Sequence, residues 1–197
     1  MVVIGVTGHR ILADPDRVSF GIAEAIDRIV EAFPGEALRI VSCLVEGADR
    51  LVARQMQRYP DSQLTAVLPL PQSDYMTDFS TTQSKREFLD LLDRADKVVE
   101  LPMSRSREQT YETAGRYVLD HCDVLVAVWD GSHAQGRGGT GDVVSEARKR
   151  GLPIAWVQAG NRKLGTKEPA TLGEEQGKVN FERFPRRTTP TEGKRGA

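Results

Sequence analysis

The sequence is short of cysteine and histidine and has no excess of charge of one sign. Its 197 residues include two Cys and three His, and 27 Lys plus Arg face 28 Asp plus Glu, which leaves a net charge of −1. Neither the two cysteines, Cys43 and Cys122, nor His121 and His133 have the spacing of metal ligands, so we expect no metal site and no disulfide framework. We also do not expect nucleic acid as a partner, because the whole chain carries no net positive charge to attract phosphates.

Long apolar runs are missing as well. Runs such as residues 124–129 have the length of a strand and fall far short of the roughly 20 residues that cross a bilayer, so we expect no membrane-spanning helix. The opening MVVIGVTGHR has no basic region before its apolar run and no small-residue cleavage site, from which we expect a cytoplasmic protein. At 39% hydrophobic residues, the chain has enough apolar side chains to fill one core.

Short solid apolar runs alternate with longer stretches in which apolar residues recur every three or four positions. This alternation is typical of an α/β fold. We expect strands at residues 2–6, 38–42, 64–68, 97–101, 124–129 and 153–157. Because these runs are apolar throughout, they predict a mostly parallel sheet that is buried on both faces and covered by helices on each side, in three layers.

The stretches between the runs have the pattern of crossover helices. An apolar stripe from Val18 to Phe33 predicts a helix that Pro34 and Gly35 end. Further helices are expected from Asp49 to Tyr59 and at residues 84–95, 111–122 and 142–150. The polar, proline-containing segment 69–82 is expected to be a long loop of the kind that covers ligands.

The composition changes at about Gly160. Apolar residues become rare, and residues 160–197 hold nine Lys or Arg against five Glu. We therefore expect a folded domain at residues 1–159 and a flexible basic tail at 160–197. Such a tail could touch nucleic acid or an acidic partner, but a solvated terminus is the simpler expectation.

Polar and glycine-rich segments follow three of the predicted strands, at the end where parallel sheets bind ligands. After the first strand, Gly8 allows close backbone approach, and Thr7, His9 and Arg10 supply hydrogen-bond donors for an anion. The alternative is a tight turn with Arg10 in solvent.

The second such segment is the small-residue turn that starts at Ser42 and contains Glu46 and Gly47. It runs directly into a helix, and the amides of a helix N-terminus favour phosphate or carboxylate. Asp49 either caps this helix or accepts hydrogen bonds from a ribose hydroxyl.

The third segment carries the strongest signal. Asp130 and Gly131 end the fifth strand, and residues 136–142 (GRGGTGD) open the next helix. Glycines fill four of the six positions 136–141, so the backbone amides beside Thr140 can converge on an anion. The segment is not a P-loop, because no Lys-Ser/Thr pair follows, and it lacks the G-x-G-x-x-G order of dinucleotide-binding folds.

Together these segments resemble the SLOG superfamily of Rossmann-like nucleotide-binding proteins. This group includes the LOG-type phosphoribohydrolases, the Rossmann domain of DNA-processing protein A and, more distantly, the nucleoside 2-deoxyribosyltransferases. The resemblance lies in SCLVEGADRLVA and in DVLVAVWDG followed by GRGGTGDVV, and covers roughly residues 2–157. It implies a Rossmann-like sandwich in which Gly138, Gly139, Thr140 and Gly141 hold the phosphate or sugar of a nucleotide.

The resemblance is incomplete at the catalytic position. The enzymes of this group place a glutamate three residues after the Gly-Thr pair, where this sequence has Val143. Asp130 is the first candidate to replace that carboxylate, followed by Glu46 and Asp142, and Asp74 or Asp78 of the long loop are further acids.

Three functions therefore stay open. The leading hypothesis is a sensor or binding domain for a nucleotide or a nucleotide-derived ligand, with no cofactor and with self-association as the resemblance implies. The alternative is an N-glycoside hydrolase of the phosphoribohydrolase type, and the third is a DNA-binding module. The candidate platforms for stacking a base are Tyr75, Phe79, Tyr111 and Trp129.

Overall fold

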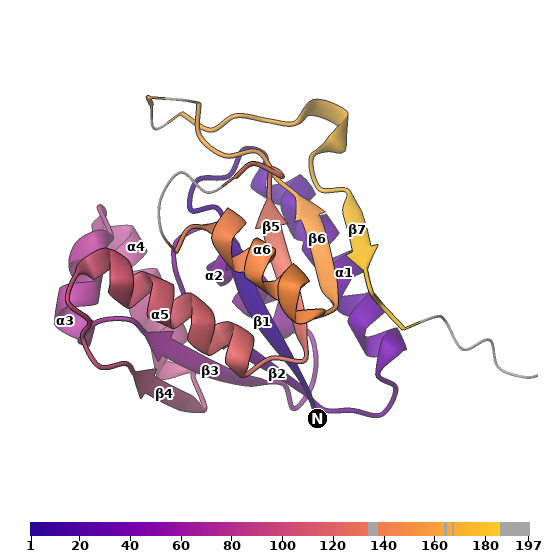
Figure 1. Ribbon diagram of the computed structural model, residues 1–197, viewed down its shortest axis with the longest axis horizontal. Helices are drawn as coiled ribbons and strands as arrows, with labels where there is room; N and C mark the ends of the chain where they lie inside the picture. The colour runs from indigo at the N-terminus through magenta and orange to yellow at the C-terminus, as the bar shows by residue number, and fades with distance from the viewer. Residues whose placement is uncertain (134–137, 164, 167, 186–197) are drawn as a thin grey trace, which may run out of the picture.

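The protein is built on one twisted sheet. The computed structural model describes residues 1–133, 138–163, 165–166 and 168–185, and their strands follow the order β4-β3-β2-β1-β5-β6-β7. The strands are β1 (Val2–Gly8), β2 (Leu38–Ser42), β3 (Gln63–Leu68), β4 (Lys97–Glu100), β5 (Val124–Trp129), β6 (Ile154–Gln158) and β7 (Val179–Glu182). The first six run parallel to one another, and β7 runs antiparallel to β6 (Figure 1). All six expected strands are thus confirmed to within two residues at either end.

Helices cover both faces of this sheet. They are α1 (Pro15–Ala32), α2 (Ala48–Met56), the short α3 (Gln72–Tyr75), α4 (Thr82–Asp93), α5 (Arg107–Asp120) and α6 (Thr140–Arg150). In Figure 1, α5 and α6 lie in front of the sheet and α1 and α2 lie behind it. The fold is therefore the expected α/β sandwich of three layers. Among the described residues, no helix is both long and apolar enough to cross a membrane.

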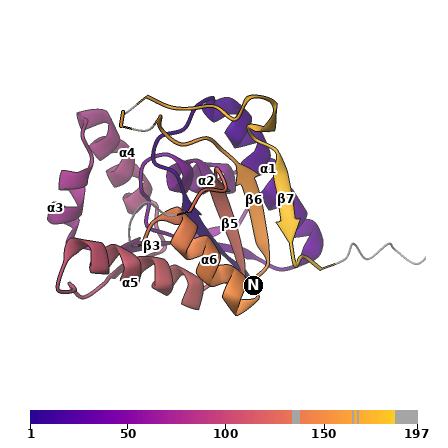
Figure 2. The same cartoon turned by 45° about the horizontal axis from the view of Figure 1, so that its top comes forward.

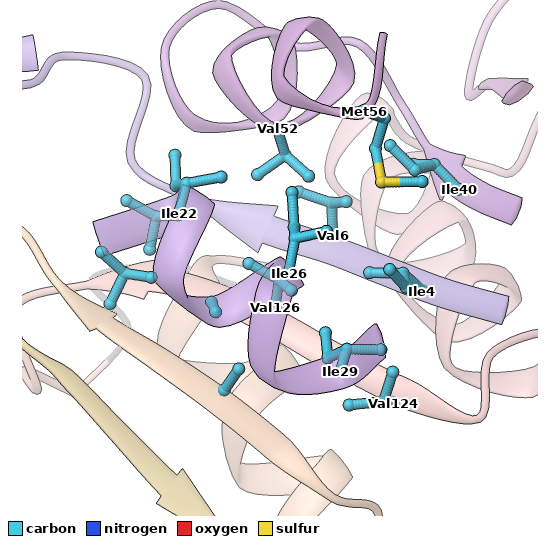
Figure 3. Close-up of a cluster of buried hydrophobic side chains, with 14 of the residues drawn as sticks. Ile4, Val6, Ile22, Ile26, Ile29, Ile40, Val52, Met56, Val124 and Val126 are labelled. Atoms are coloured by element: carbon cyan, nitrogen blue, oxygen red, sulfur yellow. The ribbon is translucent and has the colours of Figure 1, made fainter. Parts of the chain in front are cut away.

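The central strand β5 shows why the apolar runs are continuous. Val124, Val126 and Val128 belong to the core cluster under α1 and α2, whereas Leu125 and Ala127 belong to the cluster under α6. Alternate side chains of a strand point to opposite faces, so a strand that is covered on both sides is apolar at every position. Figure 3 shows the first of these clusters, with side chains of α1, α2, β1 and β5 in contact.

Helix α1 begins where the sequence supplies a cap. The Asp14 side chain accepts the backbone N–H of Arg17 at 3.2 Å, and Pro15 occupies the first helical position. The helix ends at Ala32, just before Pro34 and Gly35, as the sequence predicts.

Strand β4 differs from the expected burial on both faces. It forms one edge of the sheet, and most of its residues are exposed, including Val98 at 48%. An edge strand has a neighbour on one side only, and the charged Lys97 and Glu100 at its ends suit that position.

The segment 69–82 is also more ordered than expected. It holds α3 and a 3-10 turn, η1 (Met76–Asp78), and it buries Tyr75 and Phe79. Both rings pack against Phe88 of α4, with centroids 5.6 and 5.0 Å from it. The expectation that Tyr75 and Phe79 offer platforms for a base is therefore wrong, because both rings are part of the core.

Residues 160–185, which belong to the expected flexible tail, are largely joined to the sheet. Strand β7 adds an antiparallel edge, and Val179, Phe181 and Phe184 pack against the core under α1. An edge strand needs only one buried face, so alternation of apolar and polar residues is sufficient for it. The segment before β7 runs along the edge of the sheet at the carboxyl ends of the parallel strands (Figure 2). Residues 186–197 of the expected tail lie outside the described residues.

Candidate functional site

A cavity of about 740 Å³ opens where the carboxyl ends of β1 and β5 lie side by side. The chain adds β2, β3 and β4 on one side of β1, and β5 and β6 on the other. The loops after β1 and β5 therefore diverge toward opposite layers and leave a crevice between them. In open parallel sheets, this crevice is where ligands bind.

Gly8 sits at the bottom of this crevice because only glycine fits there. A Cβ at this position would lie 2.4 Å from the Cβ of Ala48 and 2.7 Å from the carbonyl oxygen of Val128. Two hydrogen bonds fix the turn that follows: His9 N–H to Val128 O at 3.0 Å, and Ala48 N–H to His9 O at 3.1 Å. The turn after β1 is thus held between β5 and α2, and Gly8, His9 and Arg10 all line the cavity.

His9 and Asp130 join the turns after β1 and β5. The backbone N–H of Asp130 donates to Nε2 of His9 at 3.2 Å, and Oδ1 of Asp130 lies 3.2 Å from the same nitrogen. Burial lowers the pKa of His9, so its ring is neutral at pH 7 and Nε2 can accept this hydrogen bond. His9 therefore positions Asp130 and supplies no positive charge for a phosphate.

Asp49 shapes the turn after β2. Its carboxylate accepts hydrogen bonds from the Ser42 hydroxyl at 2.8 Å and from the backbone N–H of Cys43 at 3.1 Å. Burial raises the pKa of Asp49 to about 6, although these donors favour the charged form. Gly47, and not Asp49, is the N-cap residue of α2. The expectation that Asp49 caps the helix is therefore wrong, and its carboxylate lines the cavity instead.

The glycine-rich segment forms the opposite wall. Gly138, Gly139, Thr140 and Gly141 line the cavity at the start of α6, and no side chain caps this helix. The first amides of a helix have no acceptor within the helix, and they lie at the positive end of its dipole. These amides can therefore receive an anion. Gly136 and Arg137, the first part of the predicted segment, lie outside the described residues.

Three arginines complete the lining: Arg10, Arg107 and Arg162. Arg107 opens α5, and Arg162 follows β6, so neither lies in the three segments that the sequence singled out. Asp78 lies between Arg10 and Arg107, and Tyr111 donates its hydroxyl to Asp78. The sequence does not indicate that Arg107 contacts a ligand, because ligand contacts are not expected at the start of a helix that follows an edge strand.

Five of the candidate residues in the three strand-end segments lie outside the lining. They are Ser42, Glu46, Gly47, Gly131 and Asp142. Ser42 and Asp142 support the site from behind, because Ser42 bonds Asp49 and Asp142 accepts the backbone N–H of Gly138 at 3.1 Å. Glu46 accepts the Ser84 hydroxyl on α4, away from the cavity.

Gly47 and Gly131 have structural roles. Gly47 has a φ of 78°, and a Cβ there would lie 2.4 Å from the carbonyl oxygen of Arg10. Gly131 has a φ of 83° and lies against the ring of Trp156. Trp129 lines the cavity but is 5% exposed and packs on Trp156, with ring centroids 5.4 Å apart, so little of its surface is open to a base.

Val143 also lines the cavity. It is 8% exposed and belongs to the core cluster under α6. The position at which the resembled enzymes have a glutamate is therefore apolar here. Within the described part of the chain, no group of three or more His, Cys, Asp or Glu side chains is arranged to hold a metal ion.

Comparison with known proteins identifies the fold. No family model matches the sequence, and no curated protein matches it. Among solved structures, the chain is similar to DNA processing protein A from Streptococcus pneumoniae, with a TM-score of 0.54 and 14% identity over 89% of this chain. It spans 53% of that protein, about half of its length. The chain therefore shares the Rossmann-like α/β fold that the resemblance implies.

Two further solved structures are similar over most of the chain. TM1055, a structural genomics target, has a TM-score of 0.48 and 13% identity over 78% of this chain and 72% of its own. The Moco carrier protein from Chlamydomonas reinhardtii has a TM-score of 0.42 and 20% identity over 79% of this chain and 75% of its own.

Proposed function

We propose that this protein binds a nucleotide or a nucleotide-derived ligand in the cavity between β1 and β5, with a phosphate on the first turn of α6. The observation that supports the proposal most strongly is the composition of the cavity wall. The uncapped amides of residues 139–141 and the side chains of Arg10, Arg107 and Arg162 line one space. Helix amides and guanidinium groups are the two kinds of donor that phosphate prefers in proteins.

The rest of the lining suits the other parts of a nucleotide. The volume of about 740 Å³ lies within the range of small-molecule sites. Asp49 and Asp130 offer carboxylates to ribose hydroxyls, and Tyr111, at the rim of its own aromatic cluster, offers a ring to a base. Ala114 and Val118 of α5 add an apolar surface. The proposed ligand is thus bound by its phosphate and oriented by the remaining groups.

One observation favours an enzymatic alternative. Asp49 and Asp130 both line the cavity, and cleavage of an N-glycosidic bond needs a carboxylate near the anomeric carbon. Because Val143 occupies the position of the expected glutamate, we place binding first and hydrolysis second. In the enzymatic case, Asp130→Asn abolishes turnover and spares affinity.

The proposal also has a cellular setting. We expect a cytoplasmic protein that associates with copies of itself, as the resemblance implies, and that takes a small nucleotide and not nucleic acid as its partner. The nucleotide-binding unit includes β7 and the residues before it, because Arg162 lines the cavity and β7 pairs with β6.

A nucleotide panel tests this proposal. The purified protein is melted with nucleoside monophosphates, nucleoside diphosphates, ADP-ribose and NAD, and the same samples are assayed for free base. At 100 times its dissociation constant, a ligand stabilises the fold by about 2.7 kcal/mol, which raises the melting temperature measurably. Stabilisation with intact ligand supports a binding domain, and free base supports the enzymatic alternative.

Two matched variants locate the site. Gly139→Asp places a carboxylate at the start of α6, inside the cavity, and should remove the stabilisation by the nucleotide. Thr82→Asp places the same group at the start of α4, outside the lining, and should leave it intact. If no nucleotide stabilises the wild type, or if binding survives Gly139→Asp, the proposed function is wrong.

A further inference from the structure

The lining of the cavity also contains a carboxylate that is surrounded by donors. Asp78 comes from η1, Arg10 follows β1, and Arg107 and Tyr111 belong to the first turns of α5. Nη2 of Arg107 lies 2.5 Å from Oδ1 of Asp78, and Nη2 of Arg10 lies 3.9 Å from Oδ2. The hydroxyl of Tyr111 donates to the same Oδ2. Two segments that are distant in sequence, the turn after β1 and the start of α5, thus place donors around one carboxylate from η1.

The donor set is that of an anion site. Two guanidinium groups and a phenol hydroxyl around one point fit the oxygens of a phosphate as well as those of a carboxylate. All four side chains line the cavity. The Asp78 side chain is 17% exposed, whereas those of Arg10 and Arg107 are 42% and 47% exposed. The guanidinium groups are therefore open to a ligand, with the carboxylate already bound between them.

Two of these donors, Arg107 and Tyr111, have contacts besides Asp78 that hold them in place. Nη2 of Arg107 also donates to the carbonyl oxygen of Asp74 at 3.2 Å and to the Thr77 hydroxyl at 3.4 Å. The ring of Tyr111 packs against Tyr75, with centroids 6.3 Å apart, and Tyr75 is buried. Without the Asp78 carboxylate, the wall would keep its two cations and lose the negative charge that they now face.

We propose that Arg10, Arg107 and Tyr111 form a second anion subsite in this cavity, and that Asp78 fills it with its own carboxylate until a ligand group takes its place. This inference rests on the proposed function, because it assigns the subsite to a second phosphate of the same nucleotide. The ligand class is then a nucleotide with two phosphate groups, such as a nucleoside diphosphate or bisphosphate. Asp78 is a specificity determinant: it competes with the second phosphate and sets how strongly the site prefers two phosphates over one.

Calorimetric titration with inorganic pyrophosphate tests the competition directly. Asp78→Asn keeps the size of the side chain and removes its charge, so the affinity for pyrophosphate should rise at least about tenfold over the wild type. The double variant Asp78→Asn/Arg107→Gln should lose this gain. Asp120→Asn, which removes a carboxylate that pairs with Arg150 outside the cavity lining, is the control for net charge and should bind as the wild type does.

Three results would overturn the subsite. Asp78→Asn could bind pyrophosphate no better than the wild type, the gain could persist in the double variant, or Asp120→Asn could show the same gain. A gain that persists in the double variant would mean that Arg107 does not bind the anion, and the same gain in Asp120→Asn would mean that overall charge is responsible.

A second variant tests the subsite even if the Asp78→Asn protein does not fold. Arg107→Gln in the otherwise wild-type chain should weaken ADP binding about tenfold and leave AMP binding nearly unchanged. Arg116→Gln, which breaks an exposed pair with Glu112 on the same helix, should change neither. Equal losses for ADP and AMP, or no loss for either, would contradict a subsite for the second phosphate.

The same titrations separate this inference from the proposed function. If the pyrophosphate results are as expected but no nucleotide binds, the anion subsite stands and the proposed function fails. If nucleotides bind at the start of α6 but Asp78→Asn and Arg107→Gln behave as the wild type does, the function stands and the subsite fails.

Discussion

Asp49 combines a buried carboxyl with several hydrogen-bond donors. The Ser42 hydroxyl and the backbone N–H groups of Cys43 and Val45 all favour its charged form, yet burial outweighs them and raises its pKa to about 6. The carboxyl is therefore mostly ionised at neutral pH but close enough to its pKa for a ligand to change its protonation. Because Asp49 lines the cavity, its protonation affects both the stability of the fold and the charge that a ligand meets.

This environment predicts a specific dependence of stability on pH. The folded chain holds the proton of Asp49 more tightly than the unfolded chain, whose pKa is near the ordinary 3.8. The contribution of Asp49 to the free energy of unfolding is therefore complete only below the unfolded pKa of 3.8 and is lost, by about 3 kcal/mol in all, as pH rises through the folded pKa of about 6. Asp49→Asn should remove this fall. Urea unfolding at pH 4, 5, 6 and 7 measures it.

The exposed Asp90 of α4 provides the control for this experiment. Asp90→Asn should leave the pH dependence of the wild type unchanged. If the free energy of unfolding falls by the same amount between pH 4 and 6 in Asp49→Asn as in the wild type, groups other than Asp49 cause the fall.

At the scale of elements, β7 and the turn before it depend on one buried amide. Oε1 of Gln176 accepts the backbone N–H groups of Gly160 at 3.0 Å and Leu172 at 3.1 Å, and Nε2 donates to Ala13 O at 2.5 Å. Gln176 is 3% exposed. It therefore ties the segment after β6 to the loop before α1 and helps to keep Arg162 at the cavity.

Replacing this amide should destabilise the protein. Gln176→Ala leaves the buried N–H of Gly160, and the half-buried N–H of Leu172 and carbonyl of Ala13, without their partner, which costs about 2 kcal/mol in the free energy of unfolding. Gln83→Ala, at an exposed position of α4, is the matched control and should change it by about 0.5 kcal/mol or less. Chemical unfolding of both variants measures the difference. If both variants unfold like the wild type, Gln176 does not hold this segment.

The elements also show how far the sequence alone can predict the structure. The six parallel strands and α1 follow from the period of their apolar residues, because burial on both faces or on one stripe dictates that period. Strand β7 has only four residues and alternates Val179 and Phe181 with polar neighbours, so the thin apolar content of that region concealed it. The buried rings of Tyr75 and Phe79 were missed for a similar reason, since a short helix inside a polar segment has too few residues to show a period.

The sequence predicts those parts of the site that directly follow a strand. The turns after β1 and β5 and the start of α6 lie at the carboxyl ends of adjacent strands, and the sequence places them there once the sheet is parallel. Arg107 and Arg162 reach the cavity from a helix start and from the segment after β6, and only the folded chain brings them to it. The sequence named Asp78 as one acid among several, and only its contacts with Arg10 and Arg107 distinguish it.

At the scale of the whole molecule, strand order determines where the site lies. The order β4-β3-β2-β1-β5-β6-β7 places the reversal of the sheet between β1 and β5, and the cavity lies above that reversal. The strand order alone does not select the ligand, and many ligands bind at the same place in such folds. The uncapped start of α6 and the arginines of the cavity favour phosphate as the bound group.

A crystal structure of the protein with the nucleotide that stabilises it most would test this account most directly. We expect density for one phosphate within hydrogen-bond distance of the amides of residues 139–141, with the sugar directed toward Asp49 or Asp130. Nucleotide density outside the β1–β5 cavity, such as in the smaller pocket between α2 and β3 that includes Met56 and Arg94, would contradict it.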